Sequence, residues 1–194
     1  MKQQRWSDGL VFYTSMRGEA PMNAIWDIFC TAGSLYFLGL AEGSPLRGGL
    51  DISWGAELHK GELYGPIVAN AYELESSVAQ YPRIVVGTRV VDYLRVAIQQ
   101  ADESDPIDAI NSQLASLCSH MIVTDLDGFH IIDYLGESFT KALFTEETSA
   151  TLFTQAHSFV SSQFEEFSAT KNSKLAIRYK WLLDYFQQRK SLHV

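Results

Sequence analysis

The chain has 194 residues, and 46% of them are hydrophobic, which is enough for one well-buried core and predicts a single α/β domain. Lys and Arg number 15 against 23 Asp and Glu, so the formal net charge is −8. A domain this acidic has no electrostatic reason to bind nucleic acid or an anionic membrane surface without a local basic patch, and we expect neither partner.

The first half of the chain alternates between strand and helix patterns. Residues 10–13 predict a strand, and residues 22–37 carry apolar side chains at three- and four-residue steps, which predicts a buried helix. Apolar and polar residues then alternate over residues 50–55, as in a half-buried strand. A helical stripe follows over residues 67–78, directly after a Gly-Pro pair.

The second half continues in the same way and ends in helices. Residues 83–87 predict a short buried strand, and residues 91–98 and 107–117 predict two further helices. Residues 123–135 predict a hairpin that turns on an Asp-Gly pair. After Thr148 helices dominate, and the last of them carries an aromatic stripe that indicates core packing or, alternatively, a partner-binding face.

The predicted organisation is one body with an extension. Residues 1–145 form the α/β body, and residues 146–194 form a C-terminal helical extension packed on it. Cys30 and Cys118 stand alone in apolar helical stretches, which indicates reduced thiols in a reducing compartment. The longest apolar tract, residues 25–40, is too short and too interrupted to span a bilayer, so we expect a cytoplasmic protein.

Asp8 is the strongest candidate for a metal ligand. It lies beside Gly9 at the mouth of the strand over residues 10–13. A carboxylate in that place can bind Mg²⁺, which takes one or two protein carboxylates together with substrate phosphates. The alternative is a turn aspartate that accepts backbone N–H bonds in a Ser-Asp-Gly turn. The sequence leaves both readings open.

Several blocks together resemble the catalytic core of class III nucleotidyl cyclases, and more closely a group of bacterial cyclase-like proteins that mostly lack an assigned function. The blocks, which span nearly the whole chain, are Trp6-Ser7-Asp8-Gly9, Arg47-Gly48-Gly49-Leu50, Gly65-Pro66 with Ala71-Tyr72-Glu73-Leu74-Glu75, Tyr81-Pro82-Arg83-Ile84-Val85-Val86, Asp127-Gly128 with Asp133-Tyr134-Leu135, and Tyr179-Lys180-Trp181-Leu182.

The resemblance implies a fold, a metal and a partner. It implies a ferredoxin-like, cyclase-type sheet with helices on one face, and Mg²⁺ or Mn²⁺ on Asp8. It also implies a homodimer or a heterodimer with a cyclase-like partner, because class III cyclases build their sites at dimer interfaces. We expect Arg47 and Arg83 to contact the phosphates of a nucleoside triphosphate.

The chain departs from the active members of the family at its chemical positions. The strand that carries the family's first metal-binding aspartate would precede Met1, so the cyclase-like domain is expected to be incomplete at its N-terminus. The positions that match the catalytic asparagine and the transition-state arginine are Ala69 and Glu73. An acidic side chain where charge builds up on phosphate opposes the reaction. The catalytic residues are therefore unknown, and we expect no turnover by this chain alone.

Three functions follow from these observations. The first is a degenerate cyclase homologue that acts as a nucleotide-binding or assembly module. The second is an active cyclase that makes a cyclic mononucleotide such as cAMP or cUMP, in bacterial signalling or antiphage defence. The third is a purely structural partner protein, which would bind no nucleoside triphosphate at all.

Overall fold

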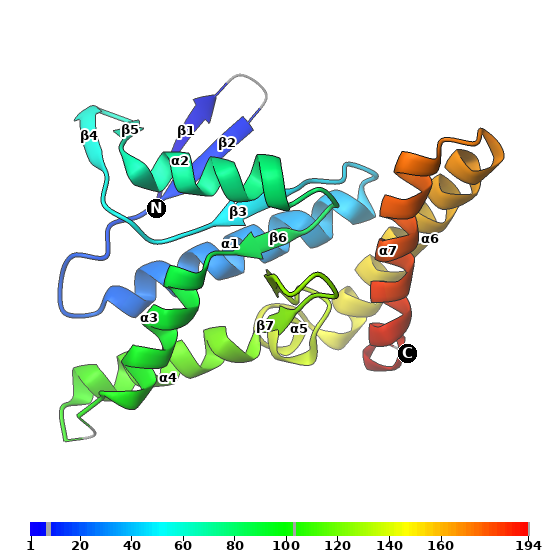
Figure 1. Cartoon of the computed structure of the whole chain (residues 1–194). Coiled ribbons are helices and arrows are strands. Elements are labelled where there is room, and N and C mark those ends of the chain that lie inside the picture. The colour runs from blue at the N-terminus through cyan, green and yellow to red at the C-terminus, as the bar shows by residue number, and fades with distance from the viewer. Residues whose placement is uncertain (7–8, 103, 194) are drawn as a thin grey trace.

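The computed structural model describes residues 1–194 except 7–8, 103 and 194. Asp8, the candidate metal ligand, lies outside the described residues. Helices surround a small central sheet, and two hairpins lie at one end of the molecule (Figure 1). The expected mixed α/β class is confirmed.

The central sheet has four short strands in the order β3-β6-β8-β7, of which β3 and β6 are parallel and the other pairs are antiparallel. Their bounds are Gly48–Leu50 for β3, Ile84–Val86 for β6, Ile122–Thr124 for β7 and His130–Ile132 for β8. The hairpin predicted over residues 123–135 is confirmed as β7–β8, and the short buried strand predicted over residues 83–87 is confirmed as β6.

Two further hairpins stand apart from this sheet. Their strands are β1 (Lys2–Trp6), β2 (Gly9–Tyr13), β4 (Ala56–His59) and β5 (Glu62–Tyr64). The hairpins contact each other, because the Leu63 amide donates to Gln4 Oε1 at 2.9 Å and Lys2 pairs with Glu57. The sequence predicted β2 alone among these four strands, since β1, β4 and β5 are largely polar and mostly exposed.

The described chain also contains seven α-helices, one π-helical turn and one 3-10 turn. They are α1 (Pro21–Ala41), α2 (Pro66–Glu73), the π turn (Leu74–Val78), α3 (Thr88–Gln99), α4 (Pro106–His120), α5 (Glu137–Leu143), α6 (Glu146–Ala169), α7 (Ser173–Arg189) and the 3-10 turn (Lys190–Leu192). Helices α6 and α7 pack against each other, and α6 also packs against α1 (Figure 1).

The alternation of side chains along the strands shows that both faces of the sheet are covered. On β6, Ile84 and Val86 belong to the main core with α1, whereas Val85 belongs to a smaller cluster with Ala79 and Ile131. Leu74, Val78 and Trp181 pack against that smaller cluster. Helices therefore lie against both faces of the sheet, whereas the sequence led us to expect them on one face.

The predicted strand over residues 50–55 is wrong in its bounds. The strand begins earlier, at Gly48, and ends at Leu50. The apolar–polar alternation continues past Leu50, but Trp54 is 69% exposed, so this part of the chain has left the core. A side chain on Gly55 would collide with Ile67 Cγ2 at 2.7 Å, which shows how closely the chain passes under the start of α2 before it reaches β4.

Within the described residues one helix, α1, meets the length and hydropathy expected of a membrane span. Here its buried face, which includes Met22, Phe29 and Phe37, packs into the main core. A core helix of a soluble protein has the same composition, so the cytoplasmic location stays a prediction.

Candidate functional site

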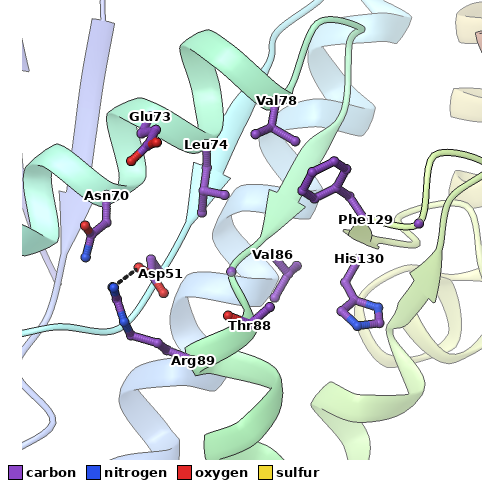
Figure 2. Close-up of a pocket in the computed structure, with 12 residues that line it drawn as sticks. Asp51, Asn70, Glu73, Leu74, Val78, Val86, Thr88, Arg89, Phe129 and His130 are labelled. Atoms are coloured by element: carbon purple, nitrogen blue, oxygen red, sulfur yellow. Dashed lines mark hydrogen bonds and ion pairs between the residues drawn. The ribbon is translucent and has the colours of Figure 1, made fainter.

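A pocket of about 420 Å³ lies where the two parallel strands end (Figure 2). Asp51 directly follows β3 and Gly87 directly follows β6, and the Gly87 amide donates to the Leu50 carbonyl at 2.7 Å. Ligands of open α/β sheets commonly bind at the carboxyl ends of the strands. The polar residues that line the pocket are Asp51, Asn70, Glu73, Thr88, Arg89 and His130.

The Asp51 carboxylate is buried, and only one of its two oxygens has a hydrogen-bond partner among the described residues. Its side chain is 6% exposed, and Arg89 Nη1 donates to Oδ2 at 2.6 Å. The other oxygen, Oδ1, is buried and has no hydrogen-bond partner among the described residues. Oδ1 would lie 2.6 Å from a Cβ placed on Gly87, so the glycine lets the carboxylate sit directly against the chain. One carboxylate oxygen is therefore left for a further donor.

Asn70 comes from α2 and lies above Asp51 (Figure 2). Its Nδ2 is buried and, within the part of the chain that the structure describes, it donates no hydrogen bond. Helix α2 reaches this position because β3 carries glycine where the two meet. A Cβ on Gly49 would lie 2.5 Å from the Ala71 carbonyl oxygen and 2.5 Å from Leu74 Cβ, so the helix lies directly on the strand.

The first turn of α3 forms a third wall of the pocket. Thr88 and Arg89 are its first residues, and no side chain caps this end. The leading N–H groups of a helix have no partner within the helix, and they carry the positive end of the helix dipole. The Arg89 guanidinium on this turn pairs with the Asp51 carboxylate.

The remaining walls are apolar. Val86 from β6 and Phe129 from the β7–β8 turn line the pocket together with Leu74 and Val78 of the π turn. A π turn inside a helix is rare and is frequently found at functional sites. Here the π turn, which continues α2, carries Leu74 and Val78, and both side chains face the pocket (Figure 2).

The charges that line the pocket do not balance. Asp51 and Glu73 contribute two carboxylates and Arg89 one guanidinium, so acidic groups outnumber Lys and Arg side chains in the lining. Arg89 is already paired with Asp51. The pocket therefore favours a neutral or cationic group over an additional anion.

Arg83, which was expected to contact phosphate, is enclosed in the protein. The residue is 2% exposed, its Nη1 and Nη2 donate to Asp127 at 3.1 and 2.6 Å, and Nη2 also donates to the Val78 carbonyl at 2.8 Å. Nη1 pairs in addition with Asp125, which accepts from Trp181 Nε1 at 2.9 Å. The guanidinium thus joins the end of the π turn to the β7–β8 turn.

The Arg83 network affects the pKa of Asp127 and the position of one pocket wall. Hydrogen bonding to the Arg83 guanidinium holds the pKa of Asp127 below its usual range. The ion pairs fix the turn between β7 and β8, and Gly128 and Phe129 of that turn line the pocket. Arg83 therefore supports one wall of the pocket without facing it.

The other expected site residues are spread over the surface. Arg47 is about half exposed and pairs with Glu75, and it does not line the pocket. Ala69 is exposed on α2. Of the two positions that match the family's catalytic asparagine and arginine, Glu73 alone lines the pocket. The structure does not bring Arg47 and Arg83 together with Glu73 in one site.

Sequence reasoning did not place Asp51, Asn70 or Arg89 in a site. A usable signal was present, because Asp51 follows the strand-forming Leu50 and the pair Thr88-Arg89 follows Gly87 at the end of the apolar run of β6. Polar residues directly after two parallel strands meet at one edge of the sheet. This signal can be recognised only when the parallel pairing of β3 with β6 is known, and the sequence did not reveal that pairing.

A second, larger pocket of about 560 Å³ lies along α6 beside the C-terminal 3-10 turn. It is lined by hydroxyl side chains of α6 together with His157, Glu165, Lys190 and His193. His193 is anchored, since Nε2 lies 2.9 Å from the Leu135 carbonyl oxygen and Nδ1 lies 3.0 Å from Ser149 Oγ. This pocket has no buried polar atom without a partner among the described residues.

The residues that the structure describes contain no group of three or more His, Cys, Asp or Glu side chains placed to hold a metal ion. Asp51 Oδ1 is the one free carboxylate oxygen buried at the pocket within those residues. The expected Mg²⁺ or Mn²⁺ would be placed on Asp8, which lies outside the described residues.

Comparison of the chain with protein families, with characterised proteins and with solved structures finds no match.

Proposed function

We propose that this chain is a cyclase-like domain that binds a nucleotide without turning it over. The observation that carries the proposal is the pocket at the ends of β3 and β6, where Asp51, Asn70 and Arg89 from three separate elements converge. A largely preformed concave site with apolar walls and a few converging polar groups is typical of small-molecule binding. The motif resemblance makes a nucleotide the preferred class of ligand.

The charge at the pocket disfavours turnover. Glu73 stands at the position that matches the family's transition-state arginine, and it lines the pocket. Loss of one preorganised charge donor typically slows a reaction by roughly 10²–10³-fold, and a carboxylate adds repulsion to that loss. Arg83 offers no replacement because it is enclosed in the protein, and its Nη1 and Nη2 are engaged with Asp125, Asp127 and the Val78 carbonyl.

A cyclase-type succession of elements, with helices on both faces of the sheet and not on one, is part of the same proposal. Its support is the order of elements after α1, in which a glycine-bearing strand, a hairpin and a Gly-Pro-led helix succeed one another as β3, β4–β5 and α2. Gly65, at the start of that helix, has φ of 122°, a conformation that favours glycine.

The test is a titration of the purified protein with the four ribonucleoside triphosphates, with and without Mn²⁺, followed by melting temperature and by analysis for cyclic products. We expect a rise in melting temperature without product, and loss of that rise in Asp51→Asn. The matched control is Asp92→Asn, since Asp92 is an exposed aspartate of α3 that pairs with Arg95 outside the pocket.

The other outcomes separate the alternatives. A cyclic product that disappears in Asp8→Ala would overturn the proposal in favour of an active cyclase making cAMP or cUMP. If no triphosphate changes the melting temperature and no product forms, the chain is a structural partner protein.

A second role, as an assembly module, is favoured by large exposed apolar side chains near the β4–β5 hairpin and on α2. Trp54, Leu58 and Tyr72 are 69%, 66% and 65% exposed. Exposed aromatic residues frequently anchor protein interfaces. We propose a homodimer or a heterodimer with a cyclase-like partner. Light scattering after size exclusion should give a dimer mass for the wild type and a monomer mass for the double variant Trp54→Ser with Tyr72→Ser. A monomer mass for the wild type would contradict the homodimer.

A further inference from the structure

Two buried polar atoms of opposite character face the same pocket without partners. Asp51 Oδ1 is an acceptor and Asn70 Nδ2 is a donor, and neither makes a hydrogen bond with any described residue. Native proteins rarely leave such atoms unsatisfied, and each instance requires an explanation. Because the two atoms do not bond to each other, each is left for a partner from outside the described residues.

The geometry holds Asp51 and the backbone that carries Asn70 in place. Asp51 accepts from Arg89 on Oδ2 and lies against Gly87, and the close contact of α2 with β3 at Gly49 fixes the part of the helix that carries Asn70. A ligand that fits such a site loses little affinity to rearrangement of the backbone.

The chemistry of the complementary group follows from the two atoms. It must present a hydrogen-bond donor to the Asp51 carboxylate and, beside it, an acceptor to the Asn70 amide. Leu74, Val78, Val86 and Phe129 supply apolar surface beside this edge. An uncharged planar ring with an adjacent donor and acceptor meets all of these conditions.

The negative charge of the pocket lining excludes the phosphate groups of a nucleotide from the pocket. Asp51 and Glu73 outnumber Arg89, and Arg89 is already engaged with Asp51. A triphosphate carries several negative charges and would be repelled by these carboxylates. The phosphates of a bound nucleotide must therefore point out of the pocket toward solvent.

We propose that the pocket binds the heterocyclic base of a nucleoside, with Asp51 accepting from a ring or amino N–H and Asn70 donating to the neighbouring ring nitrogen or carbonyl oxygen. This inference rests on the proposed nucleotide-binding function and adds which part of the nucleotide enters the pocket. Base recognition is thus assigned to Asp51, which follows β3, and to Asn70 within α2. Neither residue is among those that the motifs had indicated as site residues.

The test compares each free nucleoside with its own triphosphate by calorimetric titration, and uses ribose 5-phosphate as a probe without a base. We expect at least one nucleoside to bind no more weakly than its triphosphate, and ribose 5-phosphate not to bind. Asp51→Asn and Asn70→Leu should each weaken the nucleoside by about 10-fold or more, since each removes one hydrogen bond to a buried partner. Asp92→Asn should bind as the wild type does.

Two results would overturn this inference and are distinct from failure of the proposed function. Triphosphate binding that is unaffected by both pocket variants places the nucleotide elsewhere, so nucleotide binding stands and the base subsite fails. Binding of ribose 5-phosphate or of triphosphates with no binding of nucleosides also removes the base subsite. If no nucleoside and no triphosphate binds, both proposals fail together. Asn70→Leu keeps the test decisive should Asp51→Asn not fold.

Discussion

Replacing Arg83 by methionine should strongly destabilise the protein. The guanidinium is 2% exposed and makes hydrogen bonds to Asp125, to Asp127 and to the Val78 carbonyl. Methionine fills a similar volume but leaves Asp125, whose side chain is 6% exposed, with Trp181 as its remaining side-chain partner. The variant thus buries a carboxylate without its counter-charge.

The magnitude follows from the cost of breaking a buried ion pair by removing one partner, about 3–5 kcal/mol. Asp127 is 39% exposed and can be solvated when Arg83 is lost, so the lower end of this range applies. We expect the free energy of unfolding to fall by about 3 kcal/mol, with a melting temperature lower by roughly 6–12 °C for a chain of this length.

Equilibrium unfolding in urea measures this loss, and Arg95→Met is the matched control. Arg95 pairs with Asp92 on the exposed face of α3, where both side chains are 62% exposed, and an exposed pair contributes about 1 kcal/mol or less. A loss in Arg83→Met no larger than in Arg95→Met would refute the reasoning that the Arg83 network is a buried structural ion pair.

Three further predictions concern single side chains. Asn70→Leu should raise the unfolding free energy of the ligand-free protein by about 1 kcal/mol, because it removes a buried donor without a partner; a lower melting temperature would contradict this. Burial lowers the pKa of His193, so its contribution to stability is present above a pH of about 6.5 and is lost as the pH falls through the folded pKa. Unfolding in urea between pH 7.5 and 5.5 should therefore show a decline that is smaller in His193→Gln, and equal slopes would argue against it. Burial raises the pKa of Cys30 to about 11 and that of Cys118 to about 12, so both thiols should react with an aromatic disulfide reagent at pH 8 far more slowly in the folded than in the urea-unfolded protein; equal rates would show that the thiols are not protected.

Elements specified by local sequence were predictable. The β7–β8 hairpin turns at Asp127-Gly128, and Gly128 has φ of 85°, as expected for a glycine in such a turn. Strand β6 and helix α1 are apolar enough to be identified without any knowledge of their neighbours. The aromatic stripe of α7 does pack in the core, since Tyr179 and Tyr185 are 7% and 6% exposed.

The remaining features depend on contacts between distant segments. Arginine is usually a surface residue. Arg83 is buried because two carboxylates from a turn more than forty positions later pair with it. The pocket forms because β3 pairs with β6 in parallel and because Gly49 lets α2 approach β3. No local pattern encodes the parallel pairing, so the polar residues at the strand ends could not be recognised as one site.

The tie between α7 and the β7–β8 turn also orders events during synthesis of the chain. Asp125 must meet Arg83 from 42 positions earlier and Trp181 from 56 positions later. Chains are made from the N-terminus, and contacts between segments so far apart form late because closing long loops costs entropy. The turn that carries Phe129 therefore receives its full set of partners when nearly the entire chain has been made. A nascent chain that ends before α7 has every residue of the pocket lining and the Arg83 ion pairs, and it lacks the Trp181 contact to the same turn.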